Sequence, residues 1–260
     1  MSDVVILTGL ADSRWTWRPV ETALADAGTV LIADRTRHQT FPTLADEIVR
    51  VRDLVVGHRL GPPVVVAHSF GALIAEAYAR RYPVAGLVLV DPSWDPDATG
   101  RGAIEAGLVR AAFHGAGALG KALDVTGLAR HLGPALWSLS LRAVALRRPG
   151  AGVVAATRSV YRRGETLVAA AAEELAFRDF AAALAKSRAT SHAPEVPVVV
   201  LTAVGTDPKS RDSRHWIAAH RRLAALFPNG RHEVVRGAKH MMHIDRPEVI
   251  VREVNRLLAG

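Results

Sequence analysis

Cysteine is absent from this 260-residue chain. The absence excludes disulfides and thiolate metal ligands, so a nucleophile must be another residue type. Long apolar runs are also absent. The longest uncharged stretch lies between Arg59 and Glu76, contains a histidine, a serine and two prolines, and falls short of the roughly 18 apolar residues that a membrane helix needs. We therefore expect no insertion into a membrane.

Acidic charge is in deficit, and the formal net charge is +8. The positive residues are mostly arginine and are scattered, without a basic run flanked by aromatic residues that would stack on bases. A solvated basic surface is therefore expected, with no nucleic-acid partner. The segment Met1 to Leu10 lacks the basic flank and small-residue cleavage site of a secretory signal, so we expect a cytoplasmic location.

Short runs of β-branched apolar residues recur along the chain and predict strands that are buried on both faces. The runs are Val4 to Thr8, Thr29 to Ala33, Pro63 to Ala67, Gly86 to Val90, Pro197 to Ala203 and His232 to Val235. Segments of helical period separate or follow them, namely Pro19 to Ala27, Leu44 to Val56, Phe70 to Arg81 and Pro247 to Leu258. This alternation predicts an α/β fold with a mostly parallel sheet flanked by helices.

The alternation stops after Asp91. Residues 93–195 are rich in alanine, leucine and arginine at helical spacing, and they contain no convincing strand. We predict a core domain formed by residues 1–92 and 196–260, with a helical insertion of residues 93–195 between two strands. Glycines are expected to break the helices of this insertion at Gly115, Gly117, Gly120, Gly150 and Gly152.

Ser69 lies in the most specific motif of the sequence, in which a predicted strand is followed by Ala67-His68-Ser69-Phe70-Gly71 and then by a predicted helix. A nucleophile on a tight strand-to-helix turn needs small residues two positions before and after it, and Ala67 and Gly71 meet that need. The helix N-terminus also favours negative charge at the serine. The alternative is an ordinary serine N-cap in a βα loop.

The segment around Ser69 resembles the nucleophile elbow of the α/β-hydrolase family, and the resemblance covers about the first 95 and the last 65 residues. It implies an α/β-hydrolase fold with an inserted helical cap. The pattern from Gly9 to Trp17 resembles the family's oxyanion-hole loop, although Thr8 replaces the usual histidine. The resemblance implies that the backbone N–H groups of Leu10 and Phe70 form the oxyanion hole.

His240 follows the last predicted strand and a small-residue turn, and it precedes a helix that starts with proline. The family's catalytic histidine lies in such a loop, usually after glycine, whereas Lys239 holds that position here. His240 therefore matches the catalytic base. His243 is the rival, and we expect it to cap or pack the loop instead.

The acid of the triad has several candidates. The family's order is serine, acid, histidine, with the acid commonly after the strand that follows the inserted helices, where Asp207 and Asp212 lie. Asp91, at the end of the strand before the insertion, is the other candidate. The expected order of preference is Asp207, Asp91 and Asp212, although the separation from Asp207 to His240 is longer than is usual in the family.

These candidates share one expected place, because Leu10, Ser69, Asp91, Asp207 and His240 each follow the carboxyl end of a predicted strand. The expected function is that of a serine hydrolase of carboxylesterase type, which cleaves an ester, thioester or amide of a small molecule through a covalent acyl-enzyme. One alternative is a lyase similar to hydroxynitrile lyases, which would need a cation near the oxyanion site; no lysine is adjacent to Ser69 in the sequence, but Lys239 is adjacent to His240. The other is a binding protein with a degenerate triad.

No cofactor is expected, because the glycines do not form a dinucleotide fingerprint. No metal site is expected either, because His215, His220 and His232 are dispersed and predicted to lie at the surface. Asp34 to His38 is predicted to be a solvated loop at the pocket rim, where His38 is a candidate for substrate contact. The insertion should wall the pocket through Leu108, Phe113, Trp137 and Leu141, with Ser93 and Trp94 as further lining. The sequence leaves open whether the protein is a monomer or a homodimer.

Overall fold

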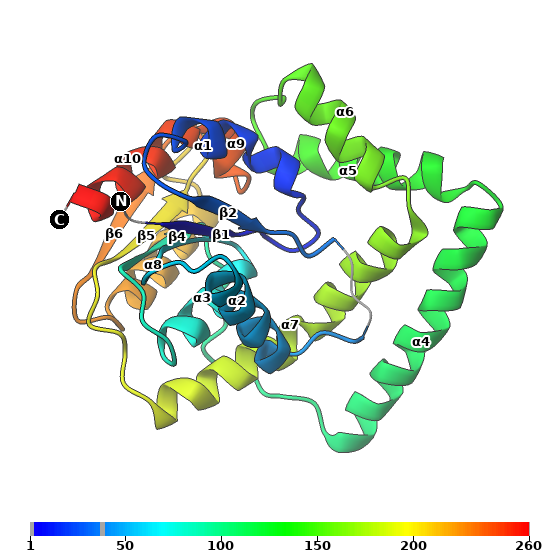
Figure 1. The fold of residues 1–260 in the computed structure, drawn as a ribbon, viewed down its shortest axis with the longest axis horizontal. Helices are drawn as coiled ribbons and strands as arrows, with labels where there is room; N and C mark the ends of the chain where they lie inside the picture. Colours follow the sequence, from blue (N-terminus) through cyan, green and yellow to red (C-terminus); the bar gives the residue numbers. More distant parts are fainter. Residues whose placement is uncertain (1–2, 37–39, 260) are drawn as a thin grey trace.

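A six-stranded parallel sheet forms the centre of the molecule in a computed structural model that describes residues 3–36 and 40–259 (Figure 1). The strand order is β2-β1-β3-β4-β5-β6, and every pairing is parallel. The strands are β1 (Val4–Leu7), β2 (Val30–Ala33), β3 (Val64–His68), β4 (Gly86–Val90), β5 (Val198–Ala203) and β6 (Gly230–Val235). All six predicted strands are confirmed, with ends that differ by at most two residues.

Two layers of helices cover the faces of the sheet. Successive strand residues point to opposite faces, so Val5 and Leu7 pack with one layer while Val4 and Ile6 pack with the other. The first layer contains α2 (Leu44–Gly57), α3 (Gly71–Ala79), the second half of α7 (Gly164–Thr190) and α8 (Arg211–Ala224). The second contains the 3-10 helix η1 (Arg14–Trp17), α1 (Arg18–Ala23), α9 (Met242–Asp245) and α10 (Pro247–Ala259). The predicted α/β architecture is thereby confirmed.

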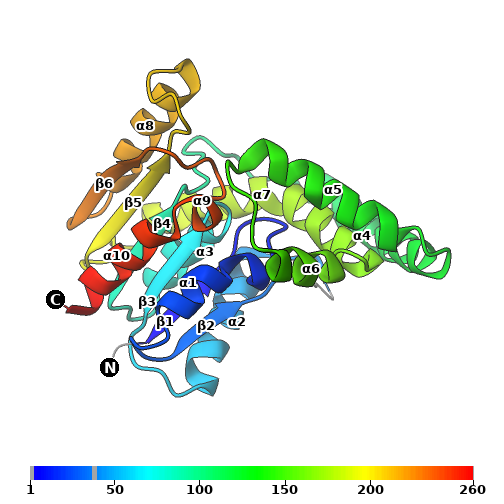
Figure 2. The same cartoon turned by 90° about the horizontal axis from the view of Figure 1, so that it is seen from above.

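Helices also fill the stretch between β4 and β5. They are α4 (Ala103–Val125), α5 (Ala129–Val144), α6 (Ala151–Val160) and α7. In Figures 1 and 2, α4, α5 and α6 stand to one side of the sheet. Among the described residues, no helix combines the length and the apolar content that crossing a membrane would require.

Several of the expected glycine breaks are wrong, and a close backbone contact between two of these helices accounts for one of them, Gly120. Gly115, Gly117 and Gly120 all lie inside the continuous helix α4. At Gly164, the first residue of α7, a Cβ atom would lie 2.0 Å from the carbonyl oxygen of Gly120. The pair of glycines therefore allows α4 and α7 to meet through their backbones. Gly150, by contrast, is the N-cap of α6, while Gly152 lies inside that helix.

Helix α7 belongs to two parts of the structure. Its second half joins the core through buried residues that include Phe180 and Leu184, and the Phe180 ring lies 4.7 Å from the ring of Phe70. Near its end, the Arg188 guanidinium pairs with Glu76 of α3 at 2.6 Å. The first half of α7 instead packs on α4 and α5. The helical segment between β4 and β5 is thus anchored to the sheet by a continuous helix.

The order of the strands reverses direction between β1 and β3, in the middle of the sheet. From β1 the chain passes to β2 on one side, and β3 then pairs with β1 on the other side. In open α/β sheets, ligands bind outside the carboxyl ends of the strands at such a reversal. Leu10 follows β1 and Ser69 follows β3, so both lie at this position.

We predict that Phe180→Ala lowers the free energy of unfolding by about 3 to 5 kcal/mol, because it removes a fully buried aromatic ring between α7 and α3. Urea denaturation followed by circular dichroism measures the change. Leu175→Ala is the control, because this residue of α7 is 42% exposed, and a loss within about 0.5 kcal/mol is expected. Equal losses for the two variants would contradict the packing of α7 in the core.

Candidate active site

Ser69 stands on a strained turn between β3 and α3. Its φ is 50°, in the left-handed region that only glycine adopts freely, and its N–H donates to the carbonyl oxygen of Val90 at 3.1 Å. At Gly71 a Cβ atom would lie 2.6 Å from the carbonyl oxygen of Thr8 and 2.7 Å from that of Leu7. Glycine at this position therefore lets the start of α3 press against the loop after β1.

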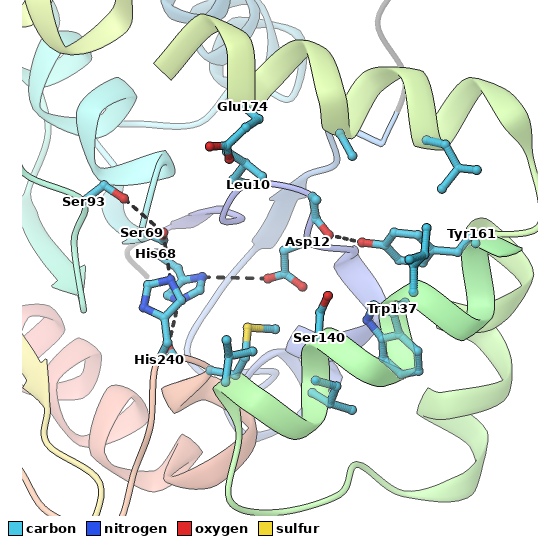
Figure 3. Close-up of a pocket in the computed structure, with 18 of the residues that line it drawn as sticks. Leu10, Asp12, His68, Ser69, Ser93, Trp137, Ser140, Tyr161, Glu174 and His240 are labelled. Atoms are coloured by element: carbon cyan, nitrogen blue, oxygen red, sulfur yellow. Dashed lines mark hydrogen bonds and ion pairs between the residues drawn. The ribbon is translucent and has the colours of Figure 1, made fainter. Parts of the chain in front are cut away.

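His240 contacts Ser69 through one ring nitrogen and an aspartate through the other. Its Nε2 lies 2.9 Å from Ser69 Oγ (Figure 3), and its Nδ1 lies 2.7 Å from Asp91 Oδ2. The carbonyl oxygen of His240 accepts a hydrogen bond from His68 Nε2 at 2.8 Å. The loop after β6 is thus tied to the ends of both β3 and β4.

Asp91 is the acid that contacts His240, contrary to the order of preference that put Asp207 first. Asp91 directly follows β4, has a φ of 42°, and accepts a second hydrogen bond from the backbone N–H of Ala203 at 2.9 Å. Asp207 lies four residues beyond β5, is exposed, and accepts from the backbone N–H of Lys209. Asp212 lies in the first turn of α8. The reason is positional, because Asp91 directly follows β4, which pairs with the strand before Ser69, whereas Asp207 lies farther along the loop after β5, where its side chain is exposed.

The two N–H groups expected for the oxyanion hole flank Ser69. Phe70 is the N-cap of α3, and Leu10 lies in the turn after β1. Within the described part of the chain, neither N–H donates a hydrogen bond to another residue. Both are thus free to bind an oxygen atom of a ligand.

The loop that carries Leu10 is held by a buried ion pair. Glu173 of α7 accepts from the N–H of Ala11 at 2.9 Å and from Arg35 Nε at 2.8 Å. The same guanidinium donates to the carbonyl oxygen of Gly9 at 3.0 Å, and the Tyr161 hydroxyl donates to the carbonyl oxygen of Ala11. Burial and nearby carboxylates raise the pKa of Tyr161, so its hydroxyl remains a donor. Residues after β4 therefore shape the loop after β1.

Arg35 also corrects one expectation. The segment Asp34 to His38 was expected to be solvated, but Arg35 is only 3% exposed because Glu173 reaches across from α7 to neutralise its charge. His38, the candidate for substrate contact, lies outside the described residues.

A cavity of about 670 Å³ opens beside Ser69, between α5 and α7 (Figure 3). Apolar side chains supply most of its wall, among them Leu10, Leu136, Trp137, Leu141, Leu167 and Phe177. Of the expected lining residues, Trp137, Leu141 and Ser93 are present. Trp94 is not among them, Leu108 is 68% exposed, and Phe113 packs against Phe41. The cavity can hold an apolar group next to the serine.

His243 packs the loop, as expected, inside a buried polar cluster. Its ring stacks on Trp17 at 4.2 Å and lies 3.4 Å from Asp12 Oδ2. Burial lowers the pKa of His243 to about 4, and burial together with the neighbouring histidines holds the pKa of His68 well below its usual value. Both rings are therefore neutral at pH 7.

Asp12, His68 and His243 come close enough together to suggest metal ligands. The Asp12 carboxylate, however, already accepts hydrogen bonds from Trp17 Nε1 at 2.9 Å, from the Thr16 hydroxyl at 2.7 Å and from a backbone N–H. We therefore interpret the cluster as a hydrogen-bonded network that holds the loop after β1.

His220 is buried rather than at the surface, which corrects another expectation. Its Nε2 donates to the carbonyl oxygen of Pro92 at 2.8 Å, and its Nδ1 lies 2.8 Å from the Thr202 hydroxyl. His232 Nε2 contacts the same hydroxyl at 2.8 Å. Burial lowers the pKa of both histidines, to about 4 for His232. This network lies directly behind Asp91. His215 is exposed, as expected.

The model of the alpha/beta hydrolase family matches residues 4–253. The chain belongs to this family. No curated protein matches the sequence. Similar solved structures include Cfl2 from Burkholderia cenocepacia, at 20% identity and a TM-score of 0.71, with 99% of this chain and 88% of that chain covered. Another is the enol-lactonase from Burkholderia xenovorans, at 19% identity and a TM-score of 0.62, with 100% and 92% covered.

A third similar structure is a haloalkane dehalogenase variant from Bradyrhizobium elkanii, at 19% identity and a TM-score of 0.65, with 100% of this chain and 89% of that chain covered. At these identities the likeness shows the alpha/beta hydrolase fold alone.

Several residues around this alpha/beta hydrolase site were not foreseen from the sequence. Arg35 and Glu173 act on the loop after β1 but are 138 residues apart, so no local pattern relates them. His68 lies inside the recognised motif, and its place beside Ser69 was the one available signal. Ser93 was expected only to line the pocket, but its hydroxyl lies 3.1 Å from Ser69 Oγ.

We predict that stability falls as pH falls from about 6.5 towards 4, because His243 gains a proton in the unfolded chain near pH 6.5 but remains neutral in the folded protein down to about pH 4. Each such histidine contributes a slope of about 1 kcal/mol per pH unit. His243→Gln keeps a donor towards Asp12 and should reduce the slope by about that amount.

Urea unfolding of both proteins at pH 5.0 and 6.5 measures this slope. The control is His114→Gln on the exposed side of α4, which should retain the slope of the wild type. An unchanged slope in His243→Gln would contradict the prediction.

Proposed function

We propose that this alpha/beta hydrolase is a serine hydrolase that cleaves a small-molecule ester through a covalent acyl-enzyme. The observation that carries the proposal is the hydrogen-bonded chain from Asp91 through His240 to Ser69 at the wall of an apolar cavity. A carbonyl group next to Ser69 would meet a nucleophile, a base and two free N–H groups at once. A thioester or an amide presents the same carbonyl chemistry.

The proposed reaction begins with attack of Ser69 Oγ on the carbonyl carbon. His240 Nε2 takes the serine proton, and the Asp91 carboxylate holds the Nδ1–H and stabilises the imidazolium. The N–H groups of Leu10 and Phe70 bind the oxyanion of the tetrahedral intermediate. His240 then gives its proton to the leaving alcohol, and water hydrolyses the acyl-enzyme by the same sequence in reverse.

Two contacts support hydrolysis over the alternatives. A lyase of the hydroxynitrile type would need a cation at the cavity, but Lys239 Nζ donates to the carbonyl oxygen of Ala143 at 3.0 Å and its side chain does not line the cavity beside Ser69. A binding protein would not need an aspartate 2.7 Å from His240 Nδ1, and Asp91 occupies that position. The carboxylate and the serine give the histidine both partners that a base requires.

The substrate class follows from the cavity wall. We infer that residues 93–195 act as a cap, because α5 and α7 supply most of the apolar side chains, Trp137 and Phe177 among them. Among the residues that the structure describes, no lysine or arginine lines the cavity, whereas Glu174 does. The proposed substrate therefore carries an apolar acyl or alcohol group, and an anionic group is disfavoured there.

Covalent labelling tests the nucleophile. An alkyl fluorophosphonate should attach to Ser69 alone, because His240 activates only this hydroxyl, and peptide mass spectrometry identifies the labelled residue. Ser69→Ala should lose both labelling and hydrolysis of p-nitrophenyl butyrate. His240→Ala should lose hydrolysis to a similar extent, because the two residues act as a unit. A label on another residue would refute the proposal.

The acid is tested by a matched pair of substitutions. Asp91→Asn should lower kcat by up to ~10,000-fold, because an amide does not hold the Nδ1–H tautomer of His240. Asp207→Asn should leave kcat within about twofold of the wild type. Steady-state kinetics measures both values, and far-ultraviolet circular dichroism verifies that each variant is folded. The opposite ranking would return the role to Asp207.

A further inference from the structure

A second hydroxyl faces the nucleophile. Ser93 Oγ lies 3.1 Å from Ser69 Oγ, on the loop that follows β4 (Figure 3). This loop is held in place, because the backbone N–H of Ser93 donates to the carbonyl oxygen of Ser69 at 3.1 Å and the carbonyl oxygen of Pro92 accepts from His220 at 2.8 Å. The backbone that carries the Ser93 hydroxyl is therefore held in place by hydrogen bonds on both residues, Pro92 and Ser93.

The direction of this hydrogen bond follows from its neighbours. The Asp91 carboxylate only accepts, so His240 Nδ1 carries a proton, and in the neutral ring Nε2 then accepts. Ser69 donates its single proton to Nε2. The oxygen of Ser69 can only accept from its second neighbour, so the hydroxyl of Ser93 is the donor.

We propose that Ser93 is a further catalytic residue, whose hydroxyl stabilises negative charge on Ser69 Oγ, chiefly while the acyl-enzyme is hydrolysed. The inference rests on the proposed function, in which Ser69 carries the acyl group. The Ser93 hydroxyl contacts the reacting oxygen, Ser69 Oγ, directly and has no other side-chain partner among the described residues.

The two chemical steps use this donor differently. During acylation the hydrogen bond eases removal of the Ser69 proton but also makes Oγ a weaker nucleophile, so the two effects oppose each other. During deacylation, water attacks the acyl carbon while His240 takes a proton from the water. The bond between the acyl carbon and Oγ then breaks, its electron pair goes to Oγ, and His240 returns the proton there. Ser93 keeps its own proton and only donates a hydrogen bond, which stabilises the leaving oxygen.

Alanine at position 93 removes the donor with little other change. The backbone N–H that binds Ser69 remains, and threonine at the same position would restore a hydroxyl. Ser159 of α6 is exposed, its hydroxyl donates to the carbonyl oxygen of Ala156, and it provides the control position for a serine-to-alanine change.

Stopped-flow hydrolysis of p-nitrophenyl butyrate tests the proposal, because the burst of p-nitrophenol reports acylation and the steady rate reports deacylation. Ser93→Ala should lower the deacylation rate constant about tenfold and change the acylation rate constant less than about threefold, as expected for loss of one hydrogen bond to a charged oxygen. Ser93→Thr should recover most of the deacylation rate. Ser159→Ala should match the wild type.

An unchanged deacylation rate in Ser93→Ala, an equal loss in both steps, or failure of threonine to restore deacylation would each overturn the role of Ser93. Fluorophosphonate labelling separates this failure from that of the proposed function. If Ser69 is labelled in the wild type and in Ser93→Ala, the nucleophile stands and only the inference about Ser93 fails. If Ser69 of the wild type is not labelled, both fall together.

Discussion

The hydrogen bond between Asp91 and His240 joins the end of β4 to the loop after β6, across 149 residues of sequence. It orients the imidazole so that Nε2 faces Ser69, whose own position depends on a strained turn at the end of β3. Two non-glycine residues in left-handed conformations, Ser69 and Asp91, directly follow the paired strands β3 and β4. Such conformations persist only where the surrounding structure holds them, and here the sheet and the loops around the site do so.

The helices after β4 participate in the site as well as enclosing it. Glu173 of α7, together with Arg35, fixes the loop that presents the Leu10 N–H, and Tyr161 binds the same loop from the end of α6. Asp245 of α9 accepts from the backbone N–H groups of Leu146 and Arg147, which follow α5. A shift of α5 or α7 would therefore move the groups that surround Ser69, and cavity shape and site geometry are coupled.

Two buried histidines that remain neutral donate hydrogen bonds to backbone carbonyl groups next to the site. His68 Nε2 donates to the carbonyl oxygen of His240, and His220 Nε2 donates to that of Pro92. Because burial lowers the pKa of both rings, each presents a fixed tautomer rather than a charge. The network behind Asp91 consequently places no additional positive charge beside the carboxylate.

The sequence by itself determined the fold class and singled out Ser69 and His240, the proposed nucleophile and base. Strands buried on both faces leave continuous β-branched runs, and the tight turn at Ser69 needs small residues at fixed spacing, so both features are local and visible. The acid, the fixed loop at Leu10 and the hydroxyl of Ser93 depend on contacts between distant segments. Asp91 and Asp207 both follow strands, but Asp91 comes directly after β4 and contacts His240, whereas Asp207 lies four residues beyond β5 and is exposed. Only the tertiary structure decided between them, because strand order and the path of each loop set that distance.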